Sequence, residues 1–399
     1  MAADGVDLAP PLSHVSLENT CSFVPSGPPR VIIDSDGDLT LKVGLTQCVN
    51  IPLNDGAGDQ CDAGSDHGHE LPVVYTVCSR TLSRASPVWK TLLYGGFVES
   101  KPSSAESASD WLVELPDDDP KAMKTVLSII HSRFDSIPRI DEAIDLEELY
   151  QLTVLTDKYD LTAMLRPWAS TWMKSAKGEW KKLRAKGIGS SIPHLERLSW
   201  ISWVMGDTSV FERVAEDLAR FCSVDANGDL QYEIGNEIVT LFSSTLEPPG
   251  LHDELKMFRL SYVKNTLAIY QDAISNFLQP PGSILSSTIC EQGSEEWTCE
   301  AAMLGAMIRS LAWIGYWPLP AATDAQASFS SIWNNLKKID TQSPVHTFCK
   351  GLKMREDTFQ RCWAPPVKFK SPITERLAKQ AAKSGLSTMK APWELETYK

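Results

Sequence analysis

Short apolar runs with the pattern of β-strands open the patterned part of the chain. Residues 30–33 are rich in β-branched side chains, Leu39–Val43 alternates apolar and polar residues, and an Asp/Gly-rich stretch at 34–38 separates the two runs. Two such runs around a turn predict a β-hairpin. Val73–Val77 and residues 111–115 predict two further strands from their β-branched and aromatic content. The N-terminal part therefore predicts a small sheet.

A helical spacing of apolar residues follows the third of these strands. Ser86-Pro87 predicts the start of a helix, because serine is a favoured N-cap and proline is tolerated at the first helical position. Gly95-Gly96 predicts its end. We expect Val88, Leu92 and Leu93 to form the buried face of this helix.

Longer helices are predicted further along the chain. Asp119, Asp145 and Asp207 each precede a run with apolar residues three or four positions apart, and so predict three N-caps. Similar stripes at 255–277 and 304–314 predict two more helices. From about residue 177 onward the periodicity is almost wholly helical, which predicts an all-α C-terminal region.

Strands in the first part and helices in the second predict an α+β protein rather than one of alternating βαβ units. Residues 50–70 are rich in Gly and Asp and predict a long loop. The predicted divisions are a disordered leader at 1–29, a sheet-and-helix domain at 30–176, a helical region at 177–280, a helical region with cysteines at 281–364, and a polar, loosely packed tail at 365–399.

A series of short motifs lies in a fixed order between residues 31 and 173. They are IDSDGDL at 33–39, VCS at 77–79, LSRASPVW at 82–89, LLYGGF at 92–97, LPDDDP at 115–120, IIH at 129–131, LTDKYD at 155–160 and LRPW at 165–168. Their order and spacing resemble the fungal branch of the BTB/POZ family. The resemblance implies a small sheet flanked by a helical cluster, used for protein–protein contact and without catalytic residues.

Two features depart from the pattern of that family. The loop at 50–70 is longer than the usual link to the third strand, and the leader before residue 31 shows no element of the kind that some members exchange between subunits. The second departure argues against a domain-swapped dimer. Further on, residues 200–207 look like the helical extension of related fungal proteins, which carries no known activity.

Phe97-Val98-Glu99 fits the apolar-x-acidic pattern through which some BTB domains dock a cullin scaffold. An apolar anchor with a charge beside it is the usual arrangement of a binding hot spot. The resemblance thus implies a partner-binding role for Phe97 and Glu99, in a substrate adaptor of a cullin-type ubiquitin ligase. Two alternatives stay open: a self-associating scaffold that binds a second copy, or a Phe97 that only closes the preceding helix against the core.

The composition narrows the class of partner. A hydrophobic fraction of 43% with 22% charged residues is typical of a globular protein. The formal net charge of −13 argues against nucleic acid or an anionic membrane as the main partner, because both attract basic surfaces. Residues 180–186 are the one basic cluster in the part of the chain that we expect to be ordered. They predict a solvated helix face, with a nuclear address or a nucleic-acid contact as the alternatives.

No stretch has the pattern of a signal peptide or a membrane-spanning helix, so we expect a cytoplasmic or nuclear protein. The nine cysteines would then be thiols or metal ligands before disulfides. The strongest candidate set for a tetrahedral zinc site is Cys290, Cys299, His346, Cys349 and Cys362. A zinc-dependent regulatory protein is therefore the alternative function, and ordinary buried thiols are the alternative explanation of these cysteines.

Weaker metal patterns occur elsewhere. His67 and His69, near Cys61, lie in a glycine-rich loop with nothing to fix their geometry. Residues 34–38 and 225–229 imitate the opening of a calcium loop but lack the glutamate at its twelfth position, and so predict turns.

The sequence also bears on catalysis. The sequence contains no Gly-x-Ser-x-Gly, no Walker loop and no dinucleotide fingerprint. We therefore expect a non-enzymatic interaction protein.

Overall fold

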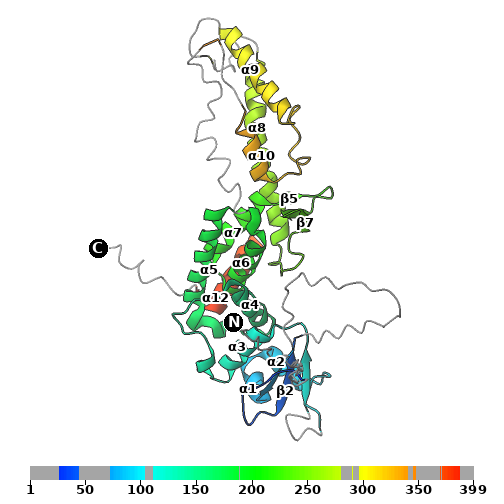
Figure 1. Ribbon diagram of the computed structural model, residues 1–399, viewed down its shortest axis with the longest axis vertical. Coiled ribbons are helices and arrows are strands. Elements are labelled where there is room, and N and C mark those ends of the chain that lie inside the picture. The colour runs from blue at the N-terminus through cyan, green and yellow to red at the C-terminus, as the bar shows by residue number, and fades with distance from the viewer. Residues whose placement is uncertain are drawn as a thin grey trace, which may run out of the picture.

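Helices dominate an elongated molecule (Figure 1). The computed structural model describes residues 27–44, 72–103, 111–187, 189–279, 290, 296–339, 345–346, 369 and 371–386. A small sheet with short helices forms one end, a bundle of helices forms the middle, and a narrow helical arm extends to the other end. This mixture agrees with the predicted α+β class. Most of the expected leader and the whole of the long loop at 50–70 lie outside the described residues.

The N-terminal sheet has the strand order β1-β3-β2-β4, made by β1 (Arg30–Ile32), β2 (Leu39–Val43), β3 (Val73–Val77) and β4 (Leu112–Leu115). All four strands lie where the sequence predicts them. The predicted hairpin is wrong, because β3 lies between β1 and β2, parallel to β1 and antiparallel to β2. A tight hairpin needs a loop of about two residues with a primed turn, and the link from β1 to β2 is longer than that.

Helices α1 (Ser79–Ala85), α2 (Pro87–Tyr94) and α3 (Pro120–Ile130) pack beside this sheet. Two predicted caps are confirmed. The Ser86 hydroxyl accepts a hydrogen bond from the Trp89 N–H at 3.1 Å, and the Asp119 carboxylate accepts one from the Ala122 N–H at 2.7 Å. Each proline that follows these caps takes the first helical position.

The buried face of α2 differs from the prediction. Trp89 and Leu93 are fully buried, whereas Val88 is exposed and Leu92 is only partly buried. Trp89 and Leu93 are four residues apart, and so are Val88 and Leu92. Spacing alone therefore does not show which pair faces the core. The tryptophan decides the choice because its ring stacks on Tyr159, with 4.5 Å between the ring centroids. The smaller Val88 is left on the outside.

The middle of the molecule is built around α6 (Ile192–Met205), which is packed against α4 (Leu146–Lys158), α5 (Arg166–Lys186) and α7 (Thr208–Phe221). Asp145 and Asp207 cap α4 and α7 through their side chains, as predicted. Almost every residue of α6 is buried, including its tryptophans. A helix buried on nearly all sides is the expected centre of a bundle. Helix α5 runs without a break through residues 176 and 177, where the sequence predicts a division between the sheet-and-helix domain and the helical region.

A helix near the C-terminus returns to this bundle. Helix α12 (Ser371–Ser384) lies against α6, so this part of the expected tail is packed rather than loose. The Arg166 guanidinium donates hydrogen bonds to the Lys383 and Ala382 carbonyls, both at 3.0 Å. The buried Ser384 hydroxyl donates to the Met205 carbonyl at 2.5 Å.

A second, three-stranded sheet interrupts the helices, so the prediction of an all-α C-terminal region is wrong. Its antiparallel strands are β5 (Ser223–Val224), β6 (Leu230–Ile234) and β7 (Glu237–Thr240). The turn before β6 is the false calcium loop, whose Asp225 carboxylate accepts the backbone N–H groups of Asn227 and Asp229 at 2.8 and 2.7 Å. Strands this short leave little alternation for a sequence pattern to detect.

The arm consists of α8 (Leu251–Phe277), α9 (Glu296–Trp313) and α10 (Phe329–Leu336). Helix α8 leaves the bundle beside α7 and extends to the far end, where α9 lies along it (Figure 1). Helix α10 returns against α7 and α8. The buried Tyr270 hydroxyl donates a hydrogen bond to the Leu336 carbonyl at 2.8 Å. Among the described helices, none combines the length and the apolar character needed to cross a membrane.

Candidate interaction surface and candidate metal centre

The loop that follows α2 is held in a fixed shape by a single serine. The Ser100 hydroxyl accepts hydrogen bonds from the N–H groups of Gly96 and Phe97 at 3.0 and 2.9 Å, and donates one to the Leu92 carbonyl at 3.1 Å. The Ser100 N–H also bonds to the Phe97 carbonyl at 3.0 Å. These bonds close the loop on the last turn of α2, so the position of Phe97 is set by the helix.

Two further contacts fix the same loop. A Cβ atom at Gly95 would lie 2.3 Å from the Thr91 carbonyl oxygen, so only glycine fits where the chain leaves α2. At the other end, the Trp111 indole N–H donates to the Glu99 carbonyl at 2.9 Å and ties the loop to the start of β4. The loop is therefore a rigid platform.

This platform presents apolar side chains to solvent. Phe97 is 58% exposed and Val98 is fully exposed. Phe97 closes one end of an open groove of about 450 Å³, whose other walls are Pro87, Val88, Thr91 and Leu92 of α2. Exposed apolar side chains that line a concave surface are a common feature of binding sites. The structure thus places Phe97 on the surface rather than in the core beneath α2.

Glu99 follows Phe97 by two residues and is half-buried. In the described part of the chain, no ion pair joins its carboxylate. The nearby Lys101 instead pairs with Asp38, at 3.2 Å between Nζ and Oδ2. Of the sequence-predicted pair, Phe97 is an exposed ring and Glu99 is a half-buried acidic group two residues away.

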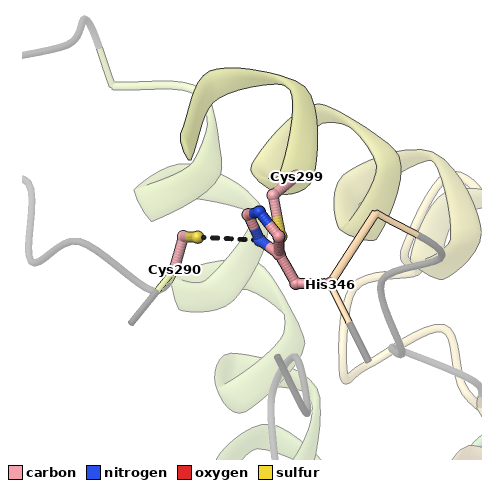
Figure 2. Close-up of side chains that lie close together, drawn as sticks. All are labelled: Cys290, Cys299 and His346. Atoms are coloured by element: carbon pink, nitrogen blue, oxygen red, sulfur yellow. Dashed lines mark hydrogen bonds between the residues drawn. The ribbon is translucent and has the colours of Figure 1, made fainter. Parts of the chain in front are cut away.

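The second candidate site lies on the arm, where Cys290, Cys299 and His346 come together (Figure 2). One potential ligand atom of each lies within 4.8 Å of the other two. The Cys290 Sγ is 3.4 Å from the His346 Nδ1. Both cysteines are thiols and buried, and the imidazole is half-buried. The remaining members of the predicted set, Cys349 and Cys362, lie outside the described residues.

Three separate segments deliver these side chains. Cys290 lies between α8 and α9, Cys299 belongs to the first turns of α9, and His346 lies beyond α10. The Cys290 N–H donates a hydrogen bond to the Glu300 carboxylate at 3.4 Å, which joins the first segment to α9. Thiolate and imidazole are ligands of transition metals, so the cluster could hold a metal ion.

Cys222 shows by contrast what an ordinary core cysteine looks like in this chain. It follows α7 and is fully buried, and burial raises the pKa of its thiol well above the usual range. No His, Asp or Glu groups with it into a metal-binding cluster in the described residues. The alternative explanation of the cysteines as small core residues therefore suits Cys222, whereas Cys290 and Cys299 share their site with an imidazole.

The basic cluster at 180–186 is partly neutralised within the molecule. Arg184 lies over the Trp180 ring, 5.1 Å from its centroid, and its guanidinium is 3.6 Å from the buried carboxylate of Asp217. Lys182 pairs with Glu179 at 2.6 Å. A positive surface for nucleic acid would need these charges to face solvent unpaired.

A polar concavity of about 420 Å³ near the start of α4 was not foreseen in the sequence, since its walls come from three helices. It is lined in part by Asp145, Glu147, His194 and Arg197. Its charges already have structural roles: Arg197 pairs with Glu147, and Asp145 caps α4.

Comparisons with known proteins bear on neither site. The resemblance to the BTB/POZ family rests on the motifs between residues 31 and 173, and the two candidate sites rest on the geometry of their side chains. No protein-family model matches the chain, and no curated protein and no solved structure matches it either.

Proposed function

We propose that the chain is a non-enzymatic adaptor that binds another protein through residues 30–176, a BTB/POZ-like domain. The observation that carries the proposal is the exposed Phe97 and Val98 on a loop held by hydrogen bonds. A rigid anchor loses little conformational entropy when it is buried in a partner. The helical regions after residue 176 extend the platform that presents this surface.

Binding would follow the usual division between an apolar centre and a polar rim. The Phe97 ring and the groove beside α2 supply the centre, and the Glu99 carboxylate supplies a charge at the edge. The partner should therefore carry an apolar side chain that fills the groove and a basic or hydrogen-bond-donating group opposite Glu99. Apolar burial gives affinity, and the charge at the rim selects the partner.

The more specific form of the proposal is a substrate adaptor of a cullin-type ubiquitin ligase. It is supported by the fit of Phe97-Val98-Glu99 to the apolar-x-acidic pattern and by the exposure of its aromatic member. The less specific form is a scaffold in which the same surface binds a second copy of the chain. The thiol state of the described cysteines suits a cytoplasmic or nuclear location.

The test is affinity purification of the full chain followed by mass spectrometry, with Phe97→Ala and Glu99→Ala variants beside the wild type. We expect Phe97→Ala to weaken capture of the partner about 30-fold, the effect of losing a hot spot worth roughly 2 kcal/mol. Ile238→Ala is the matched control, since Ile238 is a 70% exposed apolar residue on the other sheet. Capture of a cullin that survives both Phe97→Ala and Glu99→Ala would reject this docking site.

A second candidate function is a zinc-dependent regulator, favoured by the convergence of Cys290, Cys299 and His346. Two thiolates and an imidazole suit zinc better than magnesium or calcium, which prefer oxygen ligands. We expect elemental analysis of the protein, purified without chelator and dialysed after addition of zinc, to give about one zinc per chain. Well under one zinc per chain would remove this function.

A further inference from the structure

We propose that a zinc ion bound by Cys290, Cys299 and His346 fastens the outer end of the arm, so that the packing of α9 depends on the metal. This role for the ion rests on the zinc binding proposed above. Cys290 and His346 are 56 residues apart, and Cys299 belongs to a helix between them (Figure 2). One ion would therefore join three segments of the chain at this end of the molecule.

The spacing of the ligand atoms agrees with a zinc site. Zinc–sulfur and zinc–nitrogen bonds of about 2.3 and 2.0–2.1 Å place tetrahedral ligands roughly 3.6 Å apart for sulfur and nitrogen, and roughly 3.8 Å apart for two sulfurs. The observed distance from the Cys290 Sγ to the His346 Nδ1 is 3.4 Å, and no pair of ligand atoms exceeds 4.8 Å. Shifts of less than about 1 Å would thus complete three edges of the tetrahedron.

The charges also suit a buried site. Two thiolates balance the charge of Zn²⁺, and a neutral imidazole adds none, so the group as a whole is neutral. This matters because both sulfur-bearing residues are buried, with exposures of 4% for Cys290 and 0% for Cys299. The half-buried His346 lies on the side nearer solvent, where an ion could enter.

Among the described residues, helix α9 is fixed by few fully buried side chains, so a fastening at its start would matter. Between residues 297 and 313 it buries one residue per turn, namely Cys299, Met303, Met307 and Leu311. A helix that packs on a globular core usually buries a stripe about 100° wide, with three to four residues in two turns. Helix α8 has such a wide face, with Leu255, Phe258 and Tyr262 among many buried residues. Helix α9 therefore has a narrow fully buried seam, with Leu304 only partly buried beside it.

Cys299 is the first member of that seam, so metal binding and apolar packing act on the same face of α9. The ion would fix the beginning of the helix against Cys290 and His346, and the two methionines and Leu311 would continue the contact toward its end. Since a metal bound only by the folded form adds its binding free energy to folding, the arm should loosen when the ion is removed. The bundle and the N-terminal sheet have their own wide cores and should not change.

Hydrogen exchange on the full chain tests this inference, with and without a chelator and again after zinc is restored. We expect amide protection in 296–313 to fall at least about tenfold on chelation and to return with zinc, while amides of α6 stay protected. Cys290→Ala and His346→Ala should bring the same loss without chelator. Cys78→Ser is the matched control, because this thiol lies beside the N-terminal sheet, away from the arm.

The outcomes separate the two levels of the proposal. If no zinc binds, zinc-dependent function and fastening both fail. If about one zinc binds but protection in 296–313 is unchanged by its removal, the fastening fails and zinc binding stands. Peptide mapping that finds Cys290 and Cys299 joined as a disulfide in protein kept under reducing agent would also overturn the inference, because a disulfide leaves no thiolate for the ion.

Discussion

Trp89→Ala is expected to lower the free energy of unfolding by about 3–5 kcal/mol, the usual cost of removing a large aromatic side chain from a core. Trp89 is fully buried in α2, and its ring stacks on Tyr159 at the end of α4. The Ser86 hydroxyl donates a hydrogen bond to the Tyr159 carbonyl at 2.6 Å, and the Tyr159 hydroxyl donates to the buried Asp118 carboxylate at 2.5 Å. The truncation therefore opens a cavity at a junction that no neighbour can easily fill.

Urea unfolding followed by far-UV circular dichroism measures this effect. Trp313→Ala is the matched control, since Trp313 is 89% exposed and its loss should change stability by no more than about 0.5 kcal/mol. Equal destabilisation by the two variants would contradict the assignment of Trp89 to the core. The variant also bears on function, because the outer face of α2 forms the groove next to Phe97. Trp89→Ala should weaken partner capture together with stability, whereas Phe97→Ala should weaken capture alone.

Local signals in the sequence were sufficient for most elements of the fold. Serine or aspartate before an apolar run predicted the helix starts at Ser86, Asp119, Asp145 and Asp207, and each of these side chains accepts a backbone N–H bond. A cap involves groups within three residues of one another, so the sequence contains all of its partners. The same holds for β3, whose run of β-branched residues marks both of its ends.

Features that depend on distant partners were not predictable in the same way. The pairing of β1 with β3 rather than β2 is set by residues about forty positions apart, and no local pattern encodes it. Gly37, in the link between β1 and β2, shows the constraint: a Cβ atom there would lie 2.8 Å from the Val77 carbonyl oxygen at the end of β3. The sequence predicts a hairpin turn at this glycine, whereas the structure requires glycine there because the backbone passes close over the end of β3.

The two candidate sites differ in the same way, since one is made of neighbouring residues and the other of residues far apart in the sequence. The motif Phe97-Val98-Glu99 is contiguous and could be found by reading, but only the structure shows that Phe97 points away from the core. The set of possible zinc ligands was found from residue type alone, because its spacings match no zinc motif. The structure brings Cys290, Cys299 and His346 together. Cys349 and Cys362 stay a prediction.

Gly206→Ala is expected to destabilise the protein by roughly 2–5 kcal/mol, through two separate causes. Gly206 ends α6 with a φ of +72°, a left-handed conformation that costs other L-residues about 1–2 kcal/mol. In addition, a Cβ atom there would lie 2.1 Å from the backbone nitrogen of Ala381 in α12. Backbone cannot give way as a side chain can, so α12 must move, at an overpacking cost of about 1–3 kcal/mol.

The displacement of α12 gives this prediction a second readout. Moving the helix strains the bonds from Arg166 to the Lys383 and Ala382 carbonyls, so amides in 371–384 should exchange faster in Gly206→Ala. Gly178→Ala is the matched control: Gly178 lies within α5 with open space around its Cβ position, and alanine there should stabilise the helix by up to about 1 kcal/mol. Unchanged exchange in 371–384 would mean that α12 does not rest on Gly206.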